Sequence, residues 1–189
     1  MEKSKNITLL DQDYLQWVKE LSTRYRRSQI KAAVKVNEEM LRFYWELGMD
    51  IVEMHVEERW GEGVIKALST DLQKLNPTAH CFSRTNLYYV KKFYLTYSSY
   101  SIIFPQLGGQ ITQHIEENTG DANTQQVVEQ IKRDIMSIGW GHHKLLMDKC
   151  SNNPEKALFF VHQTVLNGWS RSMLLNFLDT DLYERQGRS

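Results

Sequence analysis

The chain has 189 residues, of which 41% are hydrophobic and 24% are charged, with ten glycines and three prolines. This composition suits one large or two small packed domains, and it excludes a disordered or low-complexity chain. The formal net charge is zero, so any site for nucleic acid has to be a local patch rather than a property of the whole molecule.

Targeting and redox features of the sequence indicate a cytoplasmic protein with no membrane partner. No apolar run approaches the roughly 18–20 residues that cross a bilayer. The first ten residues, MEKSKNITLL, are too charged and contain too few apolar residues for a secretory signal. The two cysteines, Cys81 and Cys150, cannot form a disulfide framework.

Long helices are expected before residue 104, where glycine and proline are sparse. Asp13 is placed to begin the first helix, because an acidic side chain accepts hydrogen bonds from the free N–H groups of a first turn. From residue 30 to residue 54 the apolar positions alternate between spacings of three and four, which is typical of a heptad seam. This helix is expected to end near residues 55–59, before Trp60-Gly61.

Two interpretations of this seam remain open. It is either a core helix packed against its own chain, or a helix that pairs with a second copy and uses Asn37 to fix the register. For the second interpretation, the candidate interface residues are Asn37, Met40, Tyr44, Leu47 and Ile51.

The remaining elements are also predicted to be helical. A short amphipathic helix over residues 62–75 ends at Asn76-Pro77, since proline cannot continue a helix. Ser83 is well placed to cap a helix that runs to about residue 97 or 100. Further helices are expected over residues 124–135, 142–150, 154–166 and 170–184.

The predicted fold class is therefore all-α, with one short strand expected near residues 101–104. A helical part over residues 10–104 contains a helix-turn-helix or winged-helix-like element. A loop or linker rich in glycine and amide side chains follows over residues 105–126. A second helical subdomain is expected over residues 127–187.

The helix after Ser83 has the pattern of a DNA-recognition helix. Residues 76–104 contain three basic residues and no acidic ones. In a helix-turn-helix, the first turn of the second helix meets base edges and later residues meet phosphates. Arg84, Thr85 and Tyr88 would then contact bases, and Lys91 and Lys92 would contact phosphates. The alternative is a core helix whose tyrosines pack inside and whose lysines are solvated.

A second basic stretch, over residues 19–35, could extend a surface that contacts phosphates. It contains six lysines and arginines and one acidic residue, Glu20. Neutralised phosphates release counterions, which supplies affinity without reading the sequence. The candidate residues are Arg24, Arg26 and Arg27; a solvated helix end explains the same pattern.

No pattern for catalysis, a cofactor or a metal is found. His142 and His143 are adjacent, so on a helix they point about 100° apart and suit a shared metal ion poorly. The chain contains no GxSxG, P-loop or GxGxxG motif. We therefore predict no catalytic residue and do not expect an enzyme.

Several strings identify a family resemblance. They are NEEMLRFYWELGMDIVE, WGEGVIKALSTDLQKLNP, FSRTNLYYVKKFY, IGWGHHKLLMDK and VLNGWSRSMLLNFLDTDLYERQG. Over residues 13–187 the chain resembles the N-terminal helical domain of YhcG-type proteins, which precedes a PD-(D/E)XK nuclease domain. The family's nuclease motif would lie beyond residues 182–187, so the resemblance implies that this chain lacks the nuclease domain. No catalytic residue is carried over.

The resemblance implies a non-catalytic module that binds double-stranded DNA and targets or assembles a nuclease, supplied in cis or in trans. A role in DNA defence or processing follows from the resemblance only. The alternative is a protein-interaction or homodimerisation module without direct DNA contact.

Overall fold

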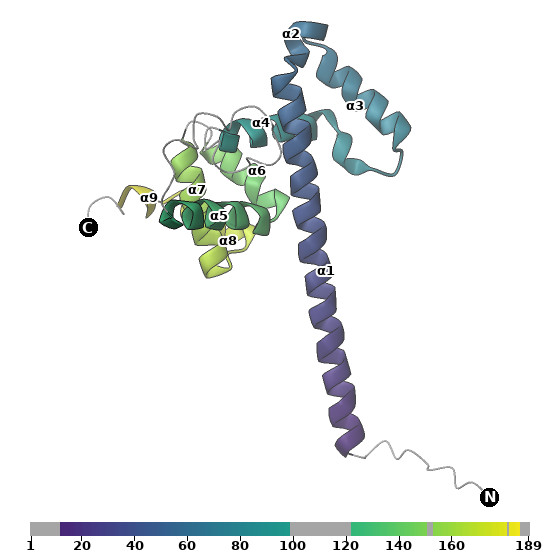
Figure 1. Cartoon of the computed structure of the whole chain (residues 1–189), viewed down its shortest axis with the longest axis vertical. Helices are drawn as coiled ribbons and strands as arrows, with labels where there is room; N and C mark the ends of the chain where they lie inside the picture. The colour runs from purple at the N-terminus through teal and green to yellow at the C-terminus, as the bar shows by residue number, and fades with distance from the viewer. Residues whose placement is uncertain (1–11, 99–121, 151–152, 181, 186–189) are drawn as a thin grey trace, which may run out of the picture. The chain divides into compact units, whose positions relative to one another are not determined.

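The computed structural model describes residues 12–98, 122–150, 153–180 and 182–185, and all regular structure in these ranges is helical (Figure 1). The prediction of an all-α fold is confirmed. The predicted strand near residues 101–104 lies outside the described residues. The helices are α1 (Gln12–Glu53), α2 (Val56–Trp60), α3 (Val64–Leu75), the 3-10 turn η1 (His80–Phe82), α4 (Arg84–Ser98), α5 (Ala122–Ser137), α6 (Trp140–Lys149), α7 (Pro154–Asn167), α8 (Arg171–Leu178) and α9 (Leu182–Arg185).

The chain divides into two compact units, Met1–Val36 and Asn37–Ser189. The described part of the first unit is the beginning of α1, and the second unit contains the rest of α1 and all the other helices. None of the described helices combines the length and the apolar character that a bilayer crossing needs.

Local sequence signals set the ends of several helices. The Ser83 side chain accepts a hydrogen bond from the backbone N–H of Asn86 at 3.2 Å, as expected for the cap of α4. Asn153 accepts one from the backbone N–H of Lys156 at 2.9 Å, and Pro154 occupies the first turn of α7. Gly168 ends α7 with a φ of 61°, a left-handed conformation that glycine adopts at little cost.

Aromatic rings fill the main core of the second unit. The ring of Phe93 lies 4.9 Å from that of His143, 5.4 Å from that of Trp140 and 5.3 Å from that of Tyr97, all centre to centre. On α1, Gly48 lies against α4, and a Cβ atom there would be 2.6 Å from the Val90 carbonyl oxygen. The absence of a side chain at Gly48 therefore allows α1 and α4 to pack at this distance.

A smaller apolar cluster joins α1, α2, α3, η1 and α4, through Ile51, Val56, Ile65, Phe82 and Leu87. Side chains of α3 fix the turn that follows it, because Ser69 and Gln73 both donate hydrogen bonds to the Phe82 carbonyl, at 2.7 and 3.0 Å. The predicted order of helix, turn and helix is thus present in α3, η1 and α4. The winged-helix resemblance stays a prediction.

The seam residues of α1 that lie in the second unit are used by the chain's own core. The Asn37 amide donates to the carbonyls of Met136 and Ile138, both at 3.2 Å. Tyr44 and Ile51 are buried, and Met40 and Leu47 are half-buried against core clusters. The intramolecular interpretation therefore accounts for these five residues, and their use as a surface for a second copy stays a prediction.

The predicted division into two helical parts stays untested, because most of the expected linker lies outside the described residues. Within the second unit, however, one core cluster draws on both sides of that linker. It includes Leu41 and Phe93 from before it and Leu146 and Phe160 from after it. The two sets of helices therefore share a core.

Candidate nucleic-acid interface

The first turn of α4 is exposed, and it contains the three residues predicted to contact bases. Arg84, Thr85 and Tyr88 are all open to solvent. The Arg84 guanidinium lies over the Tyr88 ring, 5.6 Å from its centre, in a cation–π arrangement. The opposite face of α4, including Leu87 and Val90, is buried.

The two lysines of α4 lie beside carboxylates. Lys91 forms an ion pair with Glu57 of α2. The Lys92 Nζ atom lies 3.5 Å from Asp148 Oδ1 of α6, and the Tyr89 hydroxyl donates to Asp148 Oδ2 at 2.8 Å. That hydrogen bond favours the neutral phenol and so raises the pKa of Tyr89. The cations predicted to meet phosphates are therefore partly neutralised by their own chain.

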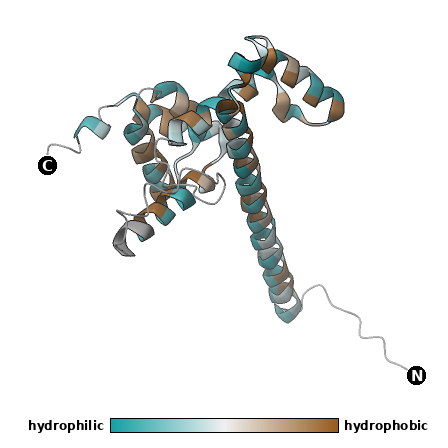
Figure 2. Cartoon of the chain, turned by 45° about the horizontal axis from the view of Figure 1, so that its top comes forward, coloured by the Kyte–Doolittle hydropathy of each residue, from teal (hydrophilic) through white to brown (hydrophobic). Residues whose placement is uncertain are grey.

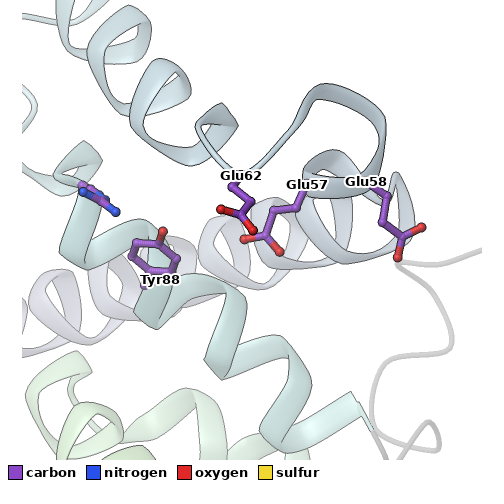
Figure 3. Close-up of a pocket in the computed structure, with 5 residues that line it drawn as sticks. Glu57, Glu58, Glu62 and Tyr88 are labelled. Atoms are coloured by element: carbon purple, nitrogen blue, oxygen red, sulfur yellow. The ribbon is translucent and has the colours of Figure 1, made fainter.

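Acidic side chains also line a pocket beside the first turn of α4. The pocket has a volume of about 550 Å³ and is lined by Glu57, Glu58, Glu62, Arg84 and Tyr88. In the view of Figure 3, Glu57 and Glu62 lie between Tyr88 and Glu58. Three carboxylates and one guanidinium line this pocket, and Lys91 pairs with one of the carboxylates, Glu57. The net charge of the group is negative, so the local field opposes the approach of a phosphate.

Sequence reasoning missed these acidic neighbours because they are distant along the chain. Residues 76–104 contain no acidic residue, but the fold brings α2 and α6 alongside α4. The sequence does show an acidic stretch over residues 38–62. Which face of α4 that stretch would meet depends on tertiary packing, for which the sequence offers no local signal.

The second predicted basic surface lies in the first unit, on the exposed beginning of α1. Arg24, Arg26 and Arg27 are exposed there, and so is Lys31. The Arg24 guanidinium lies 3.8 Å from Glu20, one helical turn earlier. Such an exposed pair is weak and screened by salt. Within the part of the chain that the structure describes, Arg26, Arg27 and Lys31 have no acidic partner.

Helical geometry places three of these cations along one line. Arg24, Arg27 and Lys31 are spaced by three and then four residues, so their side chains follow one another on the same face of α1. Neighbouring Cβ atoms in such a row are about 5–6 Å apart. We call Arg24, Arg27 and Lys31 the basic row.

The titratable groups in the core have structural partners. The His143 Nε2–H donates to the Ile135 carbonyl at 2.9 Å, which leaves Nδ1, 3.2 Å from the Tyr97 oxygen, to accept from the phenol. Burial lowers the pKa of His143 to about 4 and raises the pKa of Tyr97. Both side chains are fully buried, so the pair holds α4 against α6 and cannot reach a substrate.

A family comparison agrees with the resemblance seen in the sequence. A model described as the DUF1016 N-terminal domain matches residues 20–185, which includes the exposed turn of α4 and the basic row. No curated protein and no solved structure matches the chain. The chain therefore belongs to the DUF1016 N-terminal domain family, the N-terminal domain of YhcG-type proteins.

Proposed function

We propose that this chain is a non-catalytic, cytoplasmic DNA-binding module that targets or assembles a PD-(D/E)XK nuclease-like protein. The basic row of α1 contacts the phosphates of double-stranded DNA. Arg26, about 100° round the helix from Arg27, adds a phosphate contact outside this row. The exposed turn of α4 with Arg84, Thr85 and Tyr88 contacts bases. The family resemblance supports the association with a nuclease, and the arrangement of charges supports the division of roles between the two surfaces.

The observation that carries this proposal is the contrast between two pairs of cations. Arg27 and Lys31 are exposed and have no acidic partner among the described residues, whereas Lys91 and Lys92 lie against Glu57 and Asp148. A cation that already contacts a carboxylate releases fewer DNA counterions when it meets a phosphate. Phosphate contact is therefore assigned to α1 rather than to the lysines of α4.

Arg84 keeps the role in base contact that the sequence predicts for it. Its guanidinium is exposed beside Tyr88 and forms no ion pair within the described ranges. A planar guanidinium can donate two parallel hydrogen bonds to guanine. The neighbouring glutamates oppose nonspecific contact with phosphate at this turn, so a base contact there would add selectivity rather than general affinity.

The test is a fluorescence-anisotropy titration of a labelled DNA duplex at several salt concentrations. We expect the affinity to fall as salt rises, and the double variant Arg27→Ala, Lys31→Ala to reduce the slope of log K against log [salt] by about 2. The matched control is Lys66→Ala, Arg133→Ala, which removes two exposed cations of α3 and α5 that form no ion pair within the described residues. Equal affinity and equal slope in the two double variants would overturn the proposal.

A second candidate function, protein interaction, is favoured by a separate observation. Large apolar side chains are exposed near the start of α1, including Trp17 and Tyr25 at 54% and 65%. These residues differ from the seam residues that the core has used.

A further inference from the structure

The first unit exposes a row of large apolar side chains on α1. Leu15, Trp17, Val18, Leu21 and Tyr25 are each more than two-fifths exposed. Hydrophobic residues recur along α1 between hydrophilic ones in Figure 2. None of the five belongs to either apolar cluster formed by the described residues. A contiguous apolar surface of this kind marks a site of association.

The spacing of this surface matches a coiled-coil seam. Tyr14, Val18, Leu21 and Tyr25 are separated by four, three and four residues, and the small residues Ser28 and Ala32 continue the alternation. The next seam position is Lys35, so the repeat ends at residue 32. A repeat of 3.5 residues keeps one face of a helix against a partner helix with the same repeat. We call Tyr14, Val18, Leu21, Tyr25, Ser28 and Ala32 the apolar stripe.

We infer that the apolar stripe pairs with the apolar stripe of a second copy of this chain, as a parallel two-stranded coiled coil. A second copy presents the same spacing in the same register. The stripe and the basic row use different side chains, but Arg24 and Lys31 border the stripe, so the pairing is tested without DNA.

The charges beside the stripe favour the parallel orientation. On one side the flanking positions are Trp17, Arg24 and Lys31, and on the other they are Leu15, Ser22, Gln29 and Val36. In a parallel pair the flank with Arg24 and Lys31 on one copy faces the flank with Ser22 and Gln29 on the other. Arg24 therefore faces Gln29 of the second copy. In an antiparallel pair the flanks with Arg24 and Lys31 would face each other, and like charges would repel.

The size of the stripe is also adequate for a second copy. An aromatic side chain offers about 150–250 Å² for burial. From their exposed fractions, Trp17 and Tyr25 of two copies would together contribute about 450 Å². That is nearly half of the roughly 1,000 Å² expected for a specific interface. Leu15, Val18 and Leu21 add to it.

Pairing would also explain how this part of α1 is stabilised. Isolated helices are marginal in water, and most helical stability in proteins comes from packing an apolar face. The helix from residue 12 to residue 36 contributes nothing to the two apolar clusters of the described residues. A partner helix supplies the packing that these residues lack.

Sedimentation or light scattering of the full chain without DNA, over a hundredfold range of concentration, tests the inference. We expect a dimer that dissociates on dilution, and at least a tenfold weaker dimer in the variant Val18→Glu, Tyr25→Glu. The control Leu75→Glu changes a side chain of α3 that is 78% exposed and should leave the dimer unchanged. A monomer at every concentration overturns the inference. It does so even if the stripe then binds a different partner, such as an acidic protein or an anionic lipid vesicle.

Cross-linking provides a second test, which does not depend on whether the glutamate variant keeps its helical structure. A cysteine at seam position 21 lies opposite its own counterpart in a parallel pair, whereas one at position 23 points outward. We expect Leu21→Cys to form a disulfide-linked dimer on mild oxidation and Thr23→Cys to form little. Peptide mapping separates this bond from any made by Cys81 or Cys150. Equal cross-linking at the two positions, or none at position 21, contradicts the parallel pairing.

Discussion

Lys91 of α4 forms an ion pair with Glu57 of α2, although 34 residues separate them in the sequence. A helix with three cations and no acidic residue therefore packs beside a carboxylate from another element. Glu62 lines the same pocket beside Arg84 and Tyr88. The charge of this surface is set by the neighbours of α4 rather than by α4 alone.

Removing these carboxylates is expected to strengthen DNA binding. In the variant Glu57→Gln, Glu62→Gln, two negative charges beside the first turn of α4 disappear and Lys91 loses its partner. We expect about a fivefold gain in affinity at low salt, which corresponds to about 1 kcal/mol. The gain should shrink at high salt, because exposed charges are screened. Anisotropy titration measures it.

A matched control separates this local effect from the change in net charge. Asp71→Asn, Glu129→Gln also removes two exposed carboxylates, one from α3 and one from α5. We expect a smaller gain in this variant. If both double variants gain the same affinity for DNA, the turn of α4 does not lie close to the DNA.

The buried imidazole of His143 is expected to make the protein less stable in acid. Its pKa is about 4 in the folded chain, against about 6.5 for an ordinary histidine. Between these values the unfolded chain binds a proton that the folded chain does not, so stability falls as the pH drops from about 6.5 to 4. The expected loss is on the order of 3 kcal/mol. Urea unfolding at pH 7, 6, 5 and 4.5 measures it.

Histidine variants show whether this loss comes from His143. His143→Gln should be less stable at pH 7 but lose less stability between pH 6.5 and 4.5. His80→Gln changes an exposed histidine. Its free energy of unfolding should vary with pH as in the native chain. An unchanged pH dependence in His143→Gln would assign the effect to other groups.

A methyl group at Gly48 is expected to destabilise the second unit. An added Cβ would lie 2.6 Å from the Val90 carbonyl oxygen and 2.8 Å from the Tyr94 Cβ, so α1 and α4 would have to separate. We expect Gly48→Ala to cost about 1–3 kcal/mol in chemical unfolding. Gly63→Ala is the control, since a Cβ there meets nothing within 4 Å. Equal stability of the two variants would contradict the close packing at Gly48.

Loss of the Asn37 amide is expected to weaken folding without changing self-association. Asn37→Ala removes two hydrogen bonds, to the Met136 and Ile138 carbonyls. At about 0.5–1.5 kcal/mol for each bond, we expect a loss of about 1–3 kcal/mol in the free energy of unfolding. Sedimentation should show the same dimer affinity as in the native chain. A change in dimer affinity with unchanged stability would instead place Asn37 at the interface.

Helix positions could be predicted from the sequence wherever a local signal marks them. Ser83, Asn153-Pro154 and Gly168 each act on backbone groups within a few residues, so the ends of α4 and α7 are visible in the sequence. The expected helix over residues 170–184 is instead divided into α8 and α9. No glycine or proline marks that division.

The surroundings of the candidate site could not be predicted in this way. The exposure of Arg84 and Tyr88 follows from the periodicity of α4, which buries Leu87 and Val90. The partners of Lys91 and Lys92 come from α2 and α6, and nothing near residues 91 and 92 specifies that packing. The interpretation of the α1 seam depended in the same way on which helices would cover it.

Ser69 and Gln73 of α3 both donate hydrogen bonds to the Phe82 carbonyl, and these bonds fix the end of η1 against α3. The direction in which α4 leaves this corner therefore depends on side chains one helix earlier as well as on the turn itself, where the Asn86 amide donates to the Cys81 carbonyl. Pro77 and Thr78 are exposed and carry none of these bonds. Point substitutions at Pro77 or Thr78 are therefore expected to leave the direction of α4 unchanged, whereas the loss of Ser69 and Gln73 would release it.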